Sequence, residues 1–257
     1  AVANNDVREV RRLVTLKQAD FYARDEDGCT AIELALSLER VDIVQFFFDS
    51  LIPSVINEHL LCRHLNEQTG LALIHTIVSG KGAGGADDET IMRILKQVPN
   101  LSLNVRSANG NTALHYMCNR NTSPGIPSLV NVFLAQGADP NVVNRAGETP
   151  LHRAVLNSST DARPRLIATL LAAGSNPNHM SSRQSTPLHF AVGMRRSDCL
   201  QPLIDGGADL SLCDADGRTP LELARRENFD EAVQILQRAL AEQEQEEVEE
   251  GRKGEER

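Results

Sequence analysis

Apolar side chains recur along the chain in short runs, separated by polar stretches that contain Gly, Asn and Asp. Four of these runs, at residues 43–48, 129–134, 166–171 and 232–236, have the spacing of a buried helix face. A shorter apolar segment precedes each run and begins just after a Thr. The pattern therefore predicts pairs of helices, and each pair follows a turn.

The shorter helix of each pair begins with a recurring motif: a turn, then Thr, then Pro or Ala, an aliphatic residue, and His or Glu. It occurs at Gly28–Glu33, Gly110–His115, Gly147–His152, Gln184–His189 and Gly217–Glu222, and in degenerate form at Gly70–His75. A Thr in this place can cap the helix, and a Pro at the first helical position loses no hydrogen bond. Gly supplies the positive φ angle that such a turn needs.

The motif repeats with a nearly regular period. Successive turn positions lie 42, 40, 37, 37 and 33 residues apart. A period near 33 residues with a Thr-Pro-Leu-His signature resembles the ankyrin-repeat family, over about residues 1–240. The resemblance implies an all-α repeat solenoid of stacked helix–turn–helix units joined by short hairpin loops. Since one unit cannot bury its own apolar face, the units must stack.

We predict seven repeats, of which the first is partial, followed by an acidic tail. Repeats one to seven span about residues 1–22, 23–65, 66–103, 104–140, 141–177, 178–210 and 211–241. Residues 242–257 hold eight Glu against three basic residues, which favours a fraying helix that turns into a disordered tail. The short front of repeat one is expected if the chain begins inside a larger protein.

Several repeats are longer than the period. Repeats four and five carry four extra residues between their two helices, and repeat three carries about seven at residues 79–88. Repeat two has about nine extra residues after Leu51, where a helical turn is expected near residues 56–62. Equivalent positions stack, so the inter-helix insertions should project as a ridge, although drift in loop length explains them equally well. Repeat three also lacks the capping Thr, which predicts a weak joint.

Charge is unevenly distributed within a total of −9. Residues 1–100 carry a net −5, residues 101–200 a net +5 supplied by Arg alone, and residues 201–257 a net −9. A basic middle can steer an acidic partner toward itself, and scatter on a solvated surface is the alternative. The tail could also fold back onto the basic middle.

Motifs that could carry chemistry are weak. The Gly-rich stretch at residues 80–85 has the glycine spacing of a dinucleotide site but follows a helix instead of a strand, which favours a loop. His59, Cys62 and His64 lie close in sequence but lack a fourth ligand at a recognisable spacing. The chain is therefore predicted to be no enzyme and to need no cofactor or metal.

One His recurs in each of the repeats three to six, at His75, His115, His152 and His189. A metal array is one interpretation, but one His per stacked unit suits a structural hydrogen-bonding network. In the ankyrin family this His ties its helix start to the neighbouring backbone, so the resemblance favours the structural role.

The residue that follows this His is Tyr116, Arg153 or Phe190 in repeats four to six. An Arg here indicates a position that can face water, so the three side chains are expected to form an aromatic–Arg–aromatic stripe on the inner helices. Arg and aromatic residues are favoured binding anchors. Filling of gaps between repeats by the two rings is the alternative.

Other sequence features narrow the cellular compartment of the protein and the class of ligand it binds. Five scattered cysteines without a CxxC pair indicate reduced thiols and a cytoplasmic protein, with the nucleus as an alternative. No apolar run approaches the roughly 18 residues of a membrane-spanning helix. Overall acidity and the absence of Trp argue against nucleic-acid binding through the Arg-rich middle. We expect a monomeric module.

The resemblance implies that partner contacts come from the hairpin tips and the concave helix face. The predicted partner-binding residues are Arg106, Asn109, Tyr116 and Arg120 in repeat four, Arg145, Glu148, Arg153 and Asn157 in repeat five, and Met180, Arg183, Phe190 and Met194 in repeat six. This basic, partly apolar set predicts a signalling scaffold or adaptor that binds an acidic or amphipathic protein segment in the groove of the middle repeats. The alternative is a targeting or regulatory domain of a larger multidomain enzyme or GTPase regulator.

Overall fold

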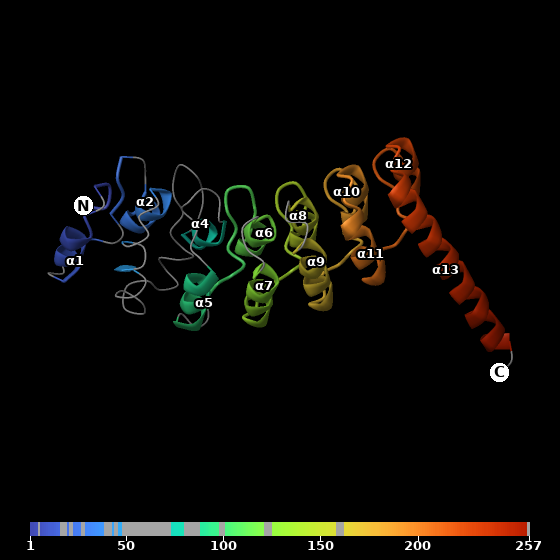
Figure 1. The fold of residues 1–257 in the computed structure, drawn as a ribbon, viewed down its shortest axis with the longest axis horizontal. Helices are drawn as coiled ribbons and strands as arrows, with labels where there is room; N and C mark the ends of the chain where they lie inside the picture. The colour runs from blue at the N-terminus through green and yellow to red at the C-terminus, as the bar shows by residue number, and fades with distance from the viewer. Residues whose placement is uncertain are drawn as a thin grey trace. The chain divides into compact units, whose positions relative to one another are not determined.

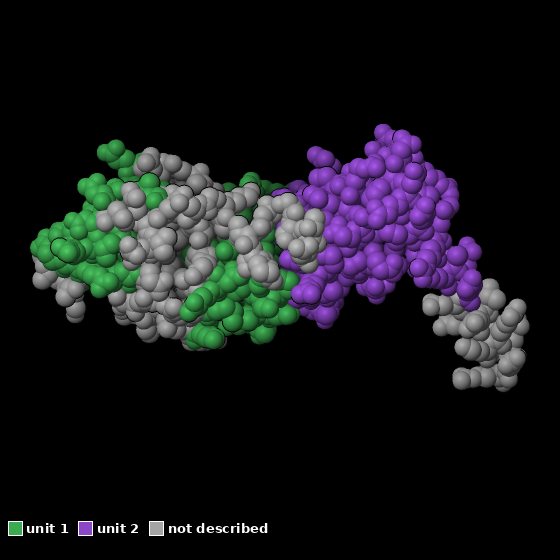
Figure 2. Space-filling model, viewed as in Figure 1, with its two compact units in different colours: residues 1–145 green, residues 146–257 purple. Residues whose placement is uncertain are grey.

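The computed structural model describes most of the chain. The described residues are 1–4, 6–15, 20, 23–26, 29–38, 43, 46–47, 73–79, 88–97, 101–120, 125–157 and 162–255. They divide into two compact units, residues 1–145 (unit 1) and 146–257 (unit 2) (Figure 2). The helical turn expected near residues 56–62, the cluster around Cys62, Ala72 in place of the capping Thr, and most of the inter-helix insertions lie outside the described residues.

Unit 1 contains helices from repeats one to four. They are α1 (Val7–Thr15), α2 (Ala31–Ser37), α4 (Leu73–Ser79), α5 (Asp88–Gln97), α6 (Ala113–Cys118) and α7 (Ile126–Ala135). The first helices α2, α4 and α6 contact one another in sequence order, and the second helix α5 contacts α7. Repeats three and four therefore each show the predicted helix pair.

Unit 2 contains three complete helix pairs. They are α8 (Pro150–Leu156) with α9 (Arg163–Ala172), α10 (Pro187–Gly193) with α11 (Ser197–Asp205), and α12 (Pro220–Arg226) with α13 (Asp230–Glu255). Each helix contacts its own pair mate and the equivalent helix of a neighbouring repeat. Two layers result, with α8, α10 and α12 in one and α9, α11 and α13 in the other (Figure 1). This is the predicted all-α repeat architecture.

The motif Thr caps the first helices as predicted. Thr186 has extended backbone angles, and its Oγ1 accepts the His189 N–H at 3.4 Å. Thr219 accepts the Glu222 N–H at 3.3 Å, while the Glu222 carboxylate accepts the Thr219 N–H at 2.9 Å. Such reciprocal bonds satisfy N–H groups that a helix start leaves without partners.

The second helices supply much of the core. Phe46, Phe47 and Phe133, which the apolar runs place at core positions, are 9, 2 and 0% exposed. Leu170 and Leu203 occupy buried positions of α9 and α11 and are fully buried. Burial of one such side chain contributes roughly 1.5–3 kcal/mol, so this layer contributes strongly to the stability of the stacked helix pairs.

The acidic tail differs from the prediction. Residues 242–255 continue α13 without a break, where the sequence predicts a fraying helix that turns into a disordered tail. Ala232, Leu236 and Ala239 are buried, which anchors the first part of α13 beside α11 and α12. The Glu- and Gln-rich sequence beyond has high helix propensity and no Pro, so the helix continues. The helix therefore extends beyond the part of α13 that packs beside α11 and α12 (Figure 1).

One buried hydroxyl group in unit 2 predicts a stabilising substitution. Ser175 is 5% exposed, and its hydroxyl has no hydrogen-bond partner among the described residues. Ala208 occupies the equivalent place in the next repeat. We expect Ser175→Ala to raise the free energy of unfolding by about 1 kcal/mol, measured by urea denaturation, because the buried unpaired hydroxyl is removed. Ser211→Ala, which removes a hydroxyl bonded to Asp209 at 2.6 Å, is the control and should give no gain.

Candidate partner-binding surface

The repeat His residues form a structural network that crosses from one repeat to the next. The Nε2 atom donates to a carbonyl oxygen of the following repeat in three cases: His75 to Val105 (2.9 Å), His152 to Ser185 (3.2 Å) and His189 to Arg218 (3.0 Å). The Nδ1 atom of His152 accepts the N–H of Thr149 at 3.2 Å, which selects the neutral tautomer protonated at Nε2. The structural interpretation is confirmed, and the described residues contain no group of side chains that could hold a metal ion.

This network makes stability depend on pH. Burial lowers the pKa of His75 and of His189 below the ordinary value of 6.5. As the pH falls below about 6.5 the unfolded chain binds protons before the native chain does, so the contribution of these groups declines. We expect a lower Tm at about pH 5.5 than at pH 7, and a smaller difference in His189→Gln. Equal pH dependence in both proteins would contradict this assignment.

The aromatic residues after the His fill gaps between repeats and remain part-exposed. The Tyr116 ring centroid lies 5.5 Å from that of His75, and the Tyr116 hydroxyl donates to Ser107 Oγ at 3.2 Å. The Phe190 ring lies edge-on to His152 at 5.0 Å. Both rings are part-buried, so they fill the gap and still present an edge to solvent.

The positive charge of Arg153 is balanced by a carboxylate of its own repeat. Its Nε atom lies 3.0 Å from Glu148 Oε2, and the two side chains are 28 and 15% exposed. Both residues belong to the predicted partner-binding set, and they bind each other. Their pairing removes net charge from this part of the first-helix face.

Two predicted residues are buried and need correction. Arg120 is 7% exposed and forms an ion pair with Asp88 at 3.5 Å, and Asn157 is 1% exposed. The sequence places both at first-helix ends, which are exposed in repeats six and seven. In repeats four and five the residues at this position are buried instead. Neither belongs to an accessible surface.

The remaining predicted residues present side chains at the surface. Arg106, Asn109 and Arg145 are exposed in unit 1, where the Arg145 N–H donates to the Asn109 carbonyl at 3.0 Å and brings two hairpins together. Arg183 is exposed in unit 2, together with Met180 (38% exposed) and Met194 (54% exposed). Unit 1 therefore presents two exposed hairpin arginines, and unit 2 presents one exposed hairpin arginine and two exposed methionines.

Sequence reasoning missed the asparagines that link successive hairpins. Asn178 donates through Nδ2 to the Gly207 carbonyl at 3.1 Å and accepts the Asp209 N–H at 2.8 Å. Asn104 makes the same two bonds, to Gly137 and Asp139. A signal was present, because Asn104, Asn141 and Asn178 recur with the 37-residue spacing of the turns.

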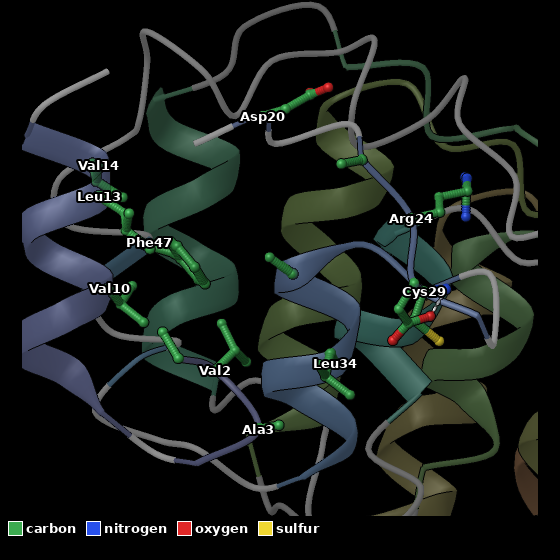
Figure 3. A pocket seen from close by; sticks show the side chains of 14 residues that line it. Val2, Ala3, Val10, Leu13, Val14, Asp20, Arg24, Cys29, Leu34 and Phe47 are labelled. Carbon is green, nitrogen blue, oxygen red and sulfur yellow. Dashed lines mark hydrogen bonds between the residues drawn. The ribbon is translucent and has the colours of Figure 1, made fainter. Parts of the chain in front are cut away.

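Unit 1 also has an apolar cavity that the sequence did not predict. It has a volume of about 380 Å³ and lies between α1 and α2 (Figure 3). Val10, Leu13 and Val14 of α1, Leu34 of α2, and Phe47 line it. The cavity belongs to repeats one and two and so lies apart from the predicted partner-binding residues.

The described cysteines are free thiols. Cys118 and Cys199 are buried, and burial raises the pKa of Cys199 to about 12, which keeps this thiol protonated and unreactive at neutral pH. In the described part of the chain, no helix has the length and apolar character needed to cross a bilayer.

Comparison with known proteins agrees with this geometry. The family model described as ankyrin repeats (3 copies) matches residues 81–167, 122–210 and 162–246, which together exceed half of the chain. A search among curated proteins found no match. The matched stretches contain the helix pairs of repeats four to seven, the capping Thr residues of those repeats, and His115, His152 and His189. The chain therefore belongs to the ankyrin-repeat family.

Proposed function

We propose that this chain is a non-enzymatic interaction module, a scaffold or adaptor that binds an acidic or amphipathic segment of another protein. Ankyrin repeats are generally protein–protein interaction modules and are generally non-catalytic. The contacts come from the hairpins and first helices of repeats four to six. We further propose a monomeric module in the cytoplasm, and the buried thiols of Cys118 and Cys199 are consistent with a reducing compartment.

The observation that carries the proposal is a set of unpaired arginines. Arg106, Arg145 and Arg183 belong to the hairpins of repeats four, five and six, are exposed, and form no ion pair with any described residue. The hairpin of repeat seven differs, because Asp216 pairs there with Arg218 and Arg226. Unpaired basic charge is thus presented by the middle hairpins, and complementary charge favours an acidic partner.

Affinity capture from cell lysate with two baits tests the proposal. One bait is the wild-type chain, and the other carries Arg106→Glu, Arg145→Glu and Arg183→Glu. A control bait with the same charge change carries Arg8→Glu, Arg165→Glu and Arg225→Glu, all at exposed helix positions. Circular dichroism checks that each variant folds. We expect acidic partners to be lost from the hairpin variant alone, and their retention would overturn the proposal.

A further inference from the structure

The first helices of unit 2 carry a row of equivalent positions in which one side chain is missing. Leu156 in α8, Gly193 in α10 and Arg226 in α12 each lie four residues after the repeat His or Glu. Contacts of α10 with both α8 and α12 place Gly193 between the other two positions. A residue without a side chain between Leu156 and Arg226 leaves a notch in the row.

Nothing in the fold requires Gly at position 193. A Cβ atom added there would meet no heavy atom within 4 Å, and the backbone does not adopt a positive φ. Gly206 is different, because a Cβ atom there would lie 2.4 Å from Leu171 Cδ1. Gly also destabilises a helix relative to Ala. The space outside Gly193 is therefore open, and packing does not explain its openness.

The walls of this notch are apolar. Phe190 lies one turn earlier on α10 and is part-exposed, and the Met194 N–H donates to its carbonyl at 2.9 Å. Met194 follows Gly193 directly and, at 54%, is the most exposed of the large apolar side chains that the structure describes. Met is adaptable and is favoured at surfaces that receive apolar side chains. Leu156, part-exposed, completes the apolar side of the row.

The polar border of the notch is basic. The Arg226 side chain is 60% exposed, and its ion pair with Asp216 is long, at 3.7 Å. Arg195, which follows Met194 directly, is exposed, and its Nη1 atom donates to the Glu227 carbonyl of repeat seven at 2.8 Å. Arg153 contributes no net charge, because Glu148 compensates it. An occupant of the notch therefore meets an apolar seat with positive charge beside it.

We propose that this notch, formed by Phe190, Gly193 and Met194, seats an apolar side chain of a partner segment, and that acidic residues beside that side chain face Arg226 and Arg195. The inference rests on the proposed function and specifies it. The occupant is an acidic amphipathic segment with a Leu, Met or Phe anchor, and both apolar burial and charge hold it on unit 2.

Methyl NMR of the methionines tests the seat directly. The chain has four Met residues, so a sample labelled at the Met methyl groups gives four resolved probes. The titrant is a synthetic helical peptide of about 16 residues with Leu on one face and Glu on the other, and an isomer with scattered Leu is the control. We expect the Met194 methyl signal to shift with the first peptide only. The Met117 signal should stay fixed, because Met117 is 1% exposed. An unmoved Met194 signal overturns the proposal.

A blocking substitution separates this inference from the proposed function. Gly193→Glu fills the notch with a side chain and a negative charge, and the open space there preserves the fold. We expect it to weaken binding of the same peptide at least roughly tenfold. Ala168→Glu adds the same charge at an exposed position of α9 and should have little effect. If Gly193→Glu binds normally while the triple Arg variant loses its partners, the seat is wrong and the interaction function stands. If neither change matters, both fail.

Discussion

Gly147→Ala is expected to lower the free energy of unfolding by about 3 kcal/mol, because two effects act together. Gly147 has a φ of +69°, a region that costs other residues roughly 1–2 kcal/mol. A Cβ atom at this position would also lie 2.6 Å from the Ser182 backbone nitrogen. The hairpin of repeat six must then move away, which strains the 2.9 Å hydrogen bond from the Ser182 N–H to the Ala146 carbonyl.

Gly217→Ala is the matched control, measured by urea denaturation alongside. Gly217 has a similar φ of +75°, but a Cβ atom there would meet nothing within 4 Å. Backbone strain alone then lowers stability by about 1 kcal/mol. The equivalent turn in repeat six tolerates Gln184 at a φ of +53°, so strain of this size is acceptable to the fold. Equal losses in the two variants would show that the contact between hairpins contributes nothing.

The sequence predicted those parts of the fold that depend on local chemistry. The capping Thr, the Pro at the first helical position and the repeat His act over three or four residues, or through one identical bond to the next repeat. Their roles could therefore be read from a single motif and its period. Thr186 and His189 lie where the motif predicts and make the expected bonds. The turn motif predicted the positive φ of Gly147, but it did not predict that Ser182 of the next hairpin lies close to Gly147.

Features that depend on the contacts of one particular repeat could not be read in this way. Arg120 is buried and pairs with Asp88 of the preceding repeat, and Arg153 pairs with Glu148 of its own repeat. The net charge of residues 101–200 includes both arginines as if they could meet a partner. In the structure each is paired with a carboxylate of this chain. The open notch at Gly193 required knowledge of its neighbours in space. The helical tail shows that acidic composition alone did not decide between helix and disorder.

Asp198→Ala is expected to destabilise unit 2 by about 3 kcal/mol, the lower end of the range for breaking a buried ion pair. Arg163 of α9 is 1% exposed, and its Nη1 atom donates to both carboxylate oxygens of Asp198 at 2.6 and 2.8 Å. Its Nε atom donates to the Asn157 carbonyl at 2.7 Å. Removal of the carboxylate leaves a guanidinium without a counter-charge. The loss stays moderate because Asp198 is 32% exposed and water can reach the site.

A double variant distinguishes the buried charge from simple loss of contacts. Arg163 and Ile126 hold the same position, the first residue of α9 and of α7, each followed by Pro, and both are 1% exposed. Arg163→Ile combined with Asp198→Ala should recover most of the stability that Asp198→Ala loses, because no buried charge remains. Urea midpoints of both variants and of the exposed control Asp205→Ala measure this. A double variant as unstable as the single one would mean that the ion pair itself holds α9 to α11. Recovery would mean that an apolar contact can replace the Arg163–Asp198 ion pair in unit 2. Ile126 occupies the same position in repeat four without a charge.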